Sequence, residues 1–346
     1  MARRALARLL TPLLFLPLLA ACAVPLTYPA GPPVTEPHFL DRWYVAADGI
    51  RMTVRTWEPA AKPKAVIVAL HGFNDYSNFF DMPGSWLADR GVMSYAYDQR
   101  GFGDGVRRGL WAGAGTYAQD LADFVTLVRR SHPGLPVYVL GESMGGAVAM
   151  TAATGAAARR PDADGVILAA PAVWGRSAMA WYEKGALWLT AHLIPTFRLT
   201  PQGLDIQPSD NIEMLRALGR DWQVIKRTRI ETIYGLVDLM DMALEASPRF
   251  SENALILYGG KDDIIPGSPT LKMVRNLPGA AAGRQTFALY GGGYHMLLRD
   301  LKAEVVWRDI LAWIEGDIAN KKTALPSGAD ERAVQALASK SLAAER

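Results

Sequence analysis

The sequence predicts an α/β protein with a mostly parallel sheet of about eight strands, flanked by helices and interrupted by a helical insertion. Three observations carry this prediction. Residues 65–70 and 137–140 are continuous apolar runs, typical of strands that are buried on both faces of a parallel sheet. Helical patterns separate such runs along the chain, as in βαβ units. A long interval, residues 172–249, contains helical patterns without strand alternation.

Composition limits the classes of function. The 346 residues, 50% of them apolar, suffice for one large domain with an elaboration. The net charge of +3 includes three arginines within the first eight residues, so the remainder is near neutral. No basic stripe with interleaved aromatic residues is visible, which argues against a nucleic-acid partner. The chain contains no repeat, P-loop or metal-ligand cluster, so we expect neither cofactor nor metal, and nothing indicates an oligomeric state.

The first 22 residues resemble a bacterial lipoprotein signal. A basic start precedes an apolar run at 9–19 that is too short to span a bilayer, which takes about 20 apolar residues. Leu-Ala-Ala-Cys at 19–22 is similar to the lipobox, in which the cysteine is diacylglyceryl-modified. This resemblance implies a signal peptide at 1–21, lipidation of Cys22 and export to a membrane-anchored position on the periplasmic or cell-surface side. An ordinary secretory signal with a coincidental cysteine is the alternative.

The segment after Cys22 is rich in proline. Residues 22–39 predict an extended tether, because such a segment does not pair in a sheet and spans about 3 Å per residue. The domain then opens with a hairpin, residues 42–46 and 51–57, that turns at Asp48-Gly49. Further along, Asp98 and Arg100 end a strand at 92–97, and we interpret both as architectural residues that hold adjacent loops.

The centre of the predicted sheet is a strand, a sharp turn and a helix at residues 137–150. Gly141 and Gly145 flank Ser143 two positions away on either side, as a tight turn requires, because a Cβ there would collide with neighbouring backbone. The turn holds the serine hydroxyl above the sheet edge. The backbone N–H of Met144 points to where negative charge on a substrate oxygen would develop. We therefore interpret Ser143 as a nucleophile.

Two further polar stretches follow predicted strands in the order Ser, Asp, His that this chemistry requires. Asp262 follows an apolar run at 255–258, and His295 follows a strand at 285–290. All three residues lie at carboxyl ends of strands, where open α/β sheets place their sites.

These motifs resemble a known family. Gly-Glu-Ser143-Met-Gly-Gly, with His71-Gly72-Phe73 upstream and Gly293-Tyr294-His295 downstream, is similar to the monoacylglycerol lipase and lysophospholipase branch of the α/β-hydrolase superfamily, over residues 40–318. The resemblance implies a catalytic triad and an oxyanion hole made by two backbone N–H groups. Its members are Ser143, Asp262 and His295 for the triad, and Phe73 and Met144 for the oxyanion hole.

Within this resemblance, Gly259 and Pro266 select Asp262 over Asp263, and His71 is interpreted as a structural loop histidine. The family implies cofactor-free hydrolysis of a small acyl ester, here a monoacylglycerol or lysophospholipid. Glu142 departs from the many relatives that carry histidine before the nucleophile. It resembles plant-type members that include acyl-shikimate esterases, so a non-lipid aryl or acyl-shikimate-type ester is an alternative. A catalytically inactive lipid-binding lipoprotein is an alternative of another class.

Residues 172–249 are predicted to form a helical cap over the core, which comprises 40–171 and 250–319. Its helices are expected at 177–194, 210–218 and 230–245, with Asp210 and Glu213 as a capping box. The first helix is apolar nearly all round, and we expect it to line an acyl tunnel or to enter lipid, with burial between cap and core as the alternative. Its candidate substrate-binding residues are Trp181, Trp188 and Leu189. Residues 320–346 are predicted to be a polar C-terminal tail.

Overall fold

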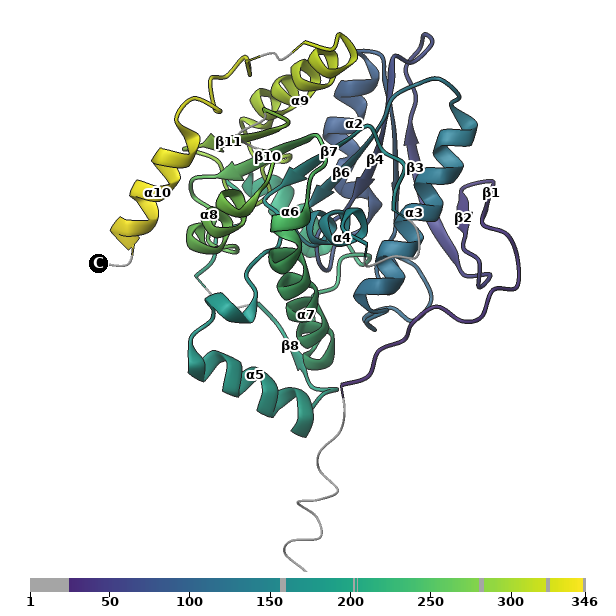
Figure 1. Cartoon of the computed structure of the whole chain (residues 1–346). Helices are drawn as coiled ribbons and strands as arrows, with labels where there is room; N and C mark the ends of the chain where they lie inside the picture. The colour runs from purple at the N-terminus through teal and green to yellow at the C-terminus, as the bar shows by residue number, and fades with distance from the viewer. Residues whose placement is uncertain are drawn as a thin grey trace, which may run out of the picture.

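The computed structural model describes residues 25–155, 160–201, 203, 205–279, 283–321 and 324–344. The predicted signal peptide and Cys22 lie outside these residues. A nine-stranded sheet with the order β1-β2-β3-β5-β4-β6-β7-β10-β11 runs through the described part (Figure 1). Its first three strands are antiparallel and the rest are parallel, so the predicted fold class is confirmed. The strands are β1 (His38–Leu40), β2 (Trp43–Val45), β3 (Arg51–Trp57), β4 (Ala65–Leu70), β5 (Val92–Tyr97), β6 (Val137–Glu142), β7 (Gly165–Ala169), β10 (Ala254–Gly259) and β11 (Gln285–Tyr290).

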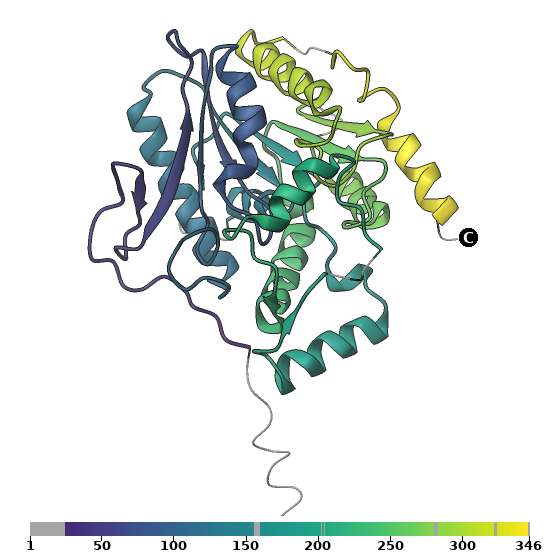
Figure 2. The same ribbon diagram turned by 180° about the vertical axis from the view of Figure 1, so that it is seen from behind.

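Helices cover both faces of the sheet (Figures 1 and 2). One face packs against α2 (Asp81–Ala88) and α9 (Ala303–Ile318), and the other against α3 (Ala114–Ser131), α4 (Met144–Ala153) and α8 (Gly267–Asn276). This double cover explains why every residue of β4 and β6 is buried, as their continuous apolar runs predict.

The insertion between β7 and β10 forms three longer helices, as predicted: α5 (Trp181–Leu193), α6 (Ile212–Arg220) and α7 (Ile230–Ala246). Two short strands that the sequence did not indicate, β8 (Arg198–Leu199) and β9 (Thr228–Arg229), pair within it. The predicted capping box at Asp210 is wrong. Asn211 caps α6 by accepting a hydrogen bond from the Met214 N–H at 3.2 Å, while Asp210 accepts one from the Leu301 N–H.

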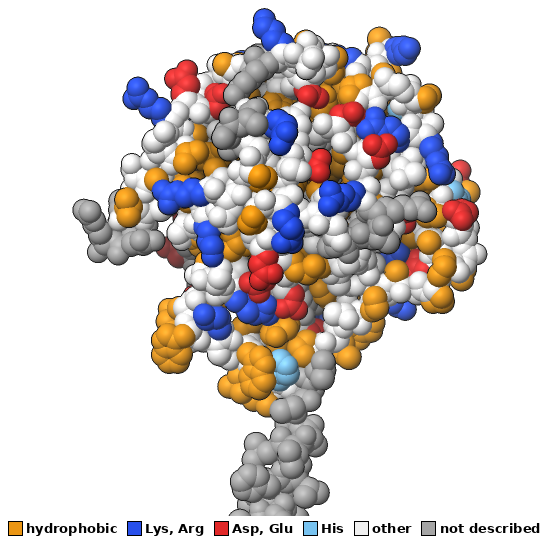
Figure 3. Space-filling model, viewed as in Figure 1, with side chains coloured by type: hydrophobic (Ala, Val, Ile, Leu, Met, Phe, Trp, Pro, Cys, Tyr) orange, Lys and Arg blue, Asp and Glu red, His pale blue; other side chains and the backbone are white. Residues whose placement is uncertain are grey.

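Helix α5 lies at the surface, with Ala191 as its one buried residue. The alternative that this helix is buried between cap and core is therefore wrong. Hydrophobic side chains gather at the end of the molecule that carries this helix (Figure 3). Among the described helices, none is both long and apolar enough to cross a membrane.

The proline-rich segment lies along the domain, contrary to the predicted free tether. The Tyr28 N–H donates to the Trp111 carbonyl at 2.7 Å, and the Val34 N–H donates to the Ala47 carbonyl at 2.7 Å. Residues 38–40 pair with the predicted hairpin as an additional strand, β1. Composition correctly indicated an extended backbone, but it could not show that the backbone donors find acceptors on distant loops.

The C-terminal segment is also part of the domain. The Leu289 N–H of β11, at the edge of the sheet, donates to the Ala329 carbonyl at 2.8 Å. Helix α10 (Ala333–Ala344) follows, with Leu337 fully buried. The prediction of a polar tail is therefore wrong for residues 324–344, because α10 packs against α8 and β11 and buries Ala333 and Leu337.

Candidate active site

Ser143 occupies the sharp turn between β6 and α4. Its backbone has a φ of 53° and a ψ of −114°, a conformation that is strained for a residue with a side chain. A Cβ at Gly145 would lie 2.3 Å from the Leu70 carbonyl oxygen, and one at Gly141 would lie 2.4 Å from Gly145. Glycines at these two positions therefore allow the turn to form, and the predicted elbow is present.

His295 and Asp262 are joined by a hydrogen bond of 2.8 Å between Nδ1 and Oδ2. The other Asp262 oxygen accepts the backbone N–H groups of Ile264 at 2.8 Å and Ile265 at 2.9 Å, so the carboxylate is held from two sides. Both side chains are buried. Asp263 is exposed, which agrees with the choice of Asp262 between the two aspartates.

The loops that carry Asp262 and His295 can approach closely because of glycine at their contact. A Cβ at Gly259 would lie 2.3 Å from the Tyr294 carbonyl oxygen. The Lys261 N–H donates to the Gly293 carbonyl at 2.8 Å, so backbone hydrogen bonding fixes the two loops together. The geometry of the Asp-His pair is thus set by the ends of β10 and β11.

The pKa of His295 is raised above its ordinary value. Burial disfavours the imidazolium and lowers this pKa, but the charge of Asp262 and its hydrogen bond to Nδ1 outweigh that effect, with Glu142 adding to it. The remaining nitrogen, Nε2, is available to accept a proton from a neighbouring hydroxyl.

Ser143 and His295 line one cavity of about 300 Å³ at the carboxyl edge of the sheet. The Phe73 side chain is also on its wall, and the N–H groups of Phe73 and Met144 have no hydrogen-bond acceptor among the described residues. Two unpaired donors near the serine can stabilise an oxyanion. Most of the cavity wall is apolar, and these side chains belong to Phe73, Ala172, Trp174, Leu236, Met240, Ile264, Ile265 and Met296.

Trp181, Trp188 and Leu189 do not line this cavity. They lie on α5 and are 81%, 52% and 49% exposed, so the expected acyl tunnel is not built from them. Helix α7 contributes Leu236 and Met240 instead, and the start of the insertion contributes Trp174. The sequence did contain a signal for α7, because Leu236 and Met240 are apolar and spaced i, i+4, which places them on one face of a helix.

A buried ionic cluster forms the polar side of the cavity, and the sequence did not indicate it. Arg299 bonds Asp75 at 2.8 Å and Glu142 at 2.9 Å, with all three side chains buried. Burial raises the pKa of Glu142, and Arg299 opposes this rise. Arg299 follows His295 by four residues, whereas Glu142 precedes Ser143, so the cluster connects the two loops that carry these side chains.

Three other polar residues have structural positions, as predicted. His71 is fully buried, and its Nε2 accepts the Gln99 N–H at 2.9 Å. Burial lowers the pKa of His71 to about 4, so the ring is neutral at physiological pH. Asp98 accepts the Ser77 N–H at 2.9 Å, and Arg100 forms ion pairs with Asp48 and Asp120. The described residues contain no group of three or more His, Cys, Asp or Glu that could hold a metal ion.

Comparison with known proteins gives the family. Residues 61–302 match the family model described as serine aminopeptidase, S33. The chain is 26% identical to human monoglyceride lipase over 289 residues, 82% of this chain and 92% of that protein. It is 22% identical to monoacylglycerol lipase of Mycolicibacterium smegmatis, covering 78% of this chain and 95% of that protein.

The fold also matches solved structures. One is a soluble variant of monoglyceride lipase from Saccharomyces cerevisiae in complex with a substrate analogue. It aligns with a TM-score of 0.64 and 19% identity over 87% of this chain and all of that chain. The similarity to this structure supports the α/β-hydrolase fold of the sheet and helices.

Proposed function

Because the chain belongs to the serine aminopeptidase (S33) family of α/β-hydrolases, we propose that it is a serine hydrolase of lipid esters with a single acyl chain. It is a carboxylic ester hydrolase similar to the monoacylglycerol lipases. The finer assignment, to a monoacylglycerol or lysophospholipid, is our proposal. The observation that carries it is the Asp262–His295 hydrogen bond beside Ser143 in an apolar cavity.

In the proposed reaction, Ser143 Oγ attacks the ester carbonyl carbon while His295 Nε2 accepts the hydroxyl proton. Asp262 holds the imidazole through Nδ1 and stabilises its cation. The N–H groups of Phe73 and Met144 bind the oxyanion, and one such donor lowers the barrier by about 3 kcal/mol. His295 then protonates the leaving alcohol. A water molecule, deprotonated by His295, hydrolyses the acyl-serine and releases the carboxylic acid.

The size of the cavity favours a substrate with one acyl chain. Its volume of about 300 Å³ is at the low end of the range for ligand pockets, roughly 300–1,000 Å³. Its wall is apolar on the sides formed by Trp174, Leu236 and Met240, where an acyl chain would pack. The Arg299 cluster supplies the polar side. A cavity of this volume has no room for the three acyl chains of a triacylglycerol.

A small non-lipid ester is the second candidate, since the same limited volume and the Trp174 side chain also suit an aryl acyl group. An aminopeptidase activity, which the family description also covers, needs a free carboxylate for the substrate ammonium. Two carboxylates line the cavity, those of Asp75 and Glu142. Both are paired with Arg299, so neither is free to bind a substrate ammonium group.

An ester panel tests this proposal. Initial rates would be measured for monoacylglycerols and lysophospholipids of increasing chain length, for a triacylglycerol, for acetyl and aryl esters, and for an aminoacyl amide. We expect kcat/KM to increase with the length of a single acyl chain and to be lowest for the triacylglycerol. Highest activity on aryl or acetyl esters would favour the second candidate. No turnover of any ester would support the inactive lipid-binding alternative.

We also propose that the protein is exported and lipid-anchored through Cys22. The support is the lipobox-like sequence, and two or more acyl chains would make a stable anchor. Changing Cys22→Ser should leave the chain unprocessed or misplaced without altering its chemistry on a soluble ester. Recovery of the unmodified native protein in a soluble periplasmic or secreted fraction would contradict the anchor.

A further inference from the structure

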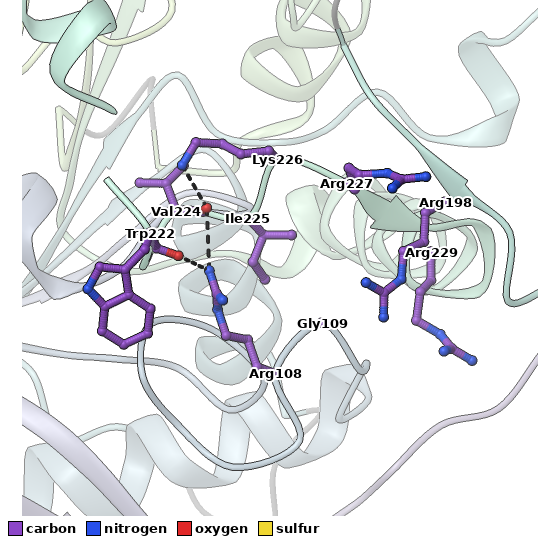
Figure 4. A pocket seen from close by; sticks show the side chains of 9 residues that line it. All are labelled: Arg108, Gly109, Arg198, Trp222, Val224, Ile225, Lys226, Arg227 and Arg229. Atoms are coloured by element: carbon purple, nitrogen blue, oxygen red, sulfur yellow. Dashed lines mark hydrogen bonds between the residues drawn. The ribbon is translucent and has the colours of Figure 1, made fainter. Parts of the chain in front are cut away.

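A second cavity, of about 290 Å³, lies in the cap region and is lined by cations (Figure 4). It is bounded by the β8–β9 pair, by residues 222–227 and by the loop that contains Gly109. Five basic side chains line it, and no carboxylate does. They belong to Arg108, Arg198, Lys226, Arg227 and Arg229.

Three of these cations have partners within the protein. Arg108 donates to the carbonyls of Trp222 and Val224, and Lys226 donates to those of Asp221 and Val224, so neither charge meets an opposite charge. Arg229 forms an ion pair with Glu231. The nearby Asp221 carboxylate faces elsewhere, accepting from the Tyr76 hydroxyl and the Gln223 N–H.

The other two cations are available. Arg198 and Arg227 are exposed, and their guanidinium groups have no hydrogen bond or ion pair with any described residue. They lie beside Arg229 on one side of the cavity, across from Arg108 and Trp222 (Figure 4). Guanidinium groups bind phosphate oxygens in a bidentate manner, and several positioned around a cavity suit an anion of that kind.

The position of the cavity indicates the source of the anion. Arg198 follows α5 by five residues, and α5 exposes Trp181, Trp188 and Leu189. Trp222, on the rim of the cavity, is exposed as well. Apolar side chains, tryptophan and arginine at one end of a molecule match the layers of a membrane surface, in which tryptophan and arginine occupy the headgroup region.

The N-terminal segment leads to the same place. The Leu26 N–H donates to Glu231 Oε2 at 3.4 Å, and Glu231 is the partner of Arg229. Leu26 lies four positions after Cys22, and this length of chain spans at most about 14 Å. A lipid attached at Cys22 would therefore hold the basic cavity close to the bilayer surface.

We infer that this basic cavity binds the phosphate group of an anionic phospholipid in the membrane that carries the protein. The inference rests on the proposed anchor at Cys22. Phosphate binding by Arg198 and Arg227 would fix the orientation of the anchored domain and place α5 against the lipid.

A competition between two vesicle populations tests this inference. Full-length protein isolated in neutral detergent would be reconstituted into an equal mixture of phosphatidylcholine vesicles and phosphatidylcholine vesicles containing phosphatidylglycerol, with the two populations separable by density. The anchor contributes equally to both populations, so the ratio of bound protein reports the preference for anionic lipid alone. Hydrolysis of a soluble acetyl ester would be measured on the same samples.

The variants are Arg198→Gln/Arg227→Gln and a control with the same charge change, Arg130→Gln/Arg284→Gln. Arg130 and Arg284 are exposed, at the end of α3 and the start of β11, where the strands of the sheet begin rather than at the cap. Each arginine near an anionic surface changes the partition by about fivefold, so the first double variant should reduce the preference for anionic vesicles about 25-fold. The control should retain the preference, and soluble-ester activity should not change in either.

Equal distribution of the wild-type protein between the two vesicle populations would overturn the inference. An equal loss of the preference for anionic vesicles in both double variants would also overturn it. Inorganic phosphate would be titrated by calorimetry in a separate measurement, and tight binding without a vesicle preference would indicate a free anion as the ligand. Failure of the anchor would appear differently, as protein bound to neither population. Failure of the proposed hydrolase function would appear only in the ester assay.

Discussion

Ser143, Asp262 and His295 are each positioned by backbone contacts, some within their own loop and others with distant parts of the chain. The strained φ of Ser143 depends on glycines that allow β4 and α4 to approach, and strain of this kind costs about 1–3 kcal/mol. The Asp262 carboxylate depends on two N–H groups of its own loop. Motif spacing was enough to predict these three residues, because each motif encodes its own local turn.

The two adjacent aspartates provide a matched test at this scale. Asp262→Asn should lower kcat by about 10⁴, because the amide no longer holds His295 in the tautomer that accepts the serine proton. Asp263→Asn, at an exposed position with the same chemical change, should remain near wild-type activity. Steady-state kinetics on a soluble ester measures both, and the reverse order would reassign the acidic residue.

The His295 environment predicts a pH dependence. The imidazole must be neutral to accept a proton, so activity should fall as pH decreases through its pKa. Because Asp262 raises that pKa, the loss should begin above the range of a free histidine, whose pKa is about 6.5. A kcat/KM profile from pH 5 to 9 measures the position of this acid limb. In Asp262→Asn, the acid limb of the remaining activity should move to lower pH. An acid limb at unchanged pH would mean that a group other than His295 causes it.

Arg299 is the residue whose loss should affect stability most among the ionic groups of the site. Arg299→Met would leave Asp75 and Glu142 buried without a counter-charge, which costs about 3–5 kcal/mol. Protonation relieves buried carboxylates, so the variant should be less stable at pH 8 than at pH 5.5 relative to wild type. Denaturant unfolding at both pH values measures this.

Arg308→Met is the control for that measurement. Arg308 pairs with Glu304 at the exposed surface of α9, where an ion pair contributes at most about 1 kcal/mol. Equal destabilisation by the two substitutions would mean that Arg299 is not essential to the buried cluster. Its partners could not be identified from sequence, because Glu142 lies 157 positions from Arg299.

At the scale of elements, α7 lines the cavity that the sequence suggested for α5, and α5 lies at the surface. Helix α5 is apolar on most sides, but periodicity does not distinguish burial in protein from exposure to a partner or to lipid. Helix α7 has an ordinary core stripe, and its Leu236 and Met240 face the cavity only because the insertion folds over the sheet edge. The position of an inserted helix depends on tertiary packing, which a single sequence does not specify.

The two helices predict different substrate effects. Leu236→Ser should raise KM for long single-chain esters, by up to about 0.8 kcal/mol for each methylene that is no longer buried, and leave acetyl esters nearly unchanged. Trp188→Ser on α5 should leave KM unchanged for substrates dissolved below their aggregation limit. A larger effect of Trp188→Ser on such substrates would restore α5 as the acyl-binding helix.

At the scale of the whole molecule, the described chain combines the fold class that the sequence predicted with two terminal segments that it did not. Residues 25–40 follow the surface to the end of the molecule that carries α5, and residues 324–344 cover β11 (Figures 1 and 2). Their sequences are proline-rich or polar, and several of their contacts are backbone hydrogen bonds, which leave little trace in residue type. The described chain thus begins at the end of the molecule that carries the cap.

The proposed reaction requires Ser143 to form a covalent acyl intermediate. The measurement is intact-protein mass spectrometry after reaction with a fluorophosphonate, followed by peptide mapping, on the wild type and on Ser143→Ala. We expect one adduct on the wild type, located on Ser143, with loss of ester turnover in proportion to labelling. A folded Ser143→Ala variant should show neither adduct nor turnover. An adduct on another residue, or ester turnover that persists in Ser143→Ala, would contradict the proposed reaction.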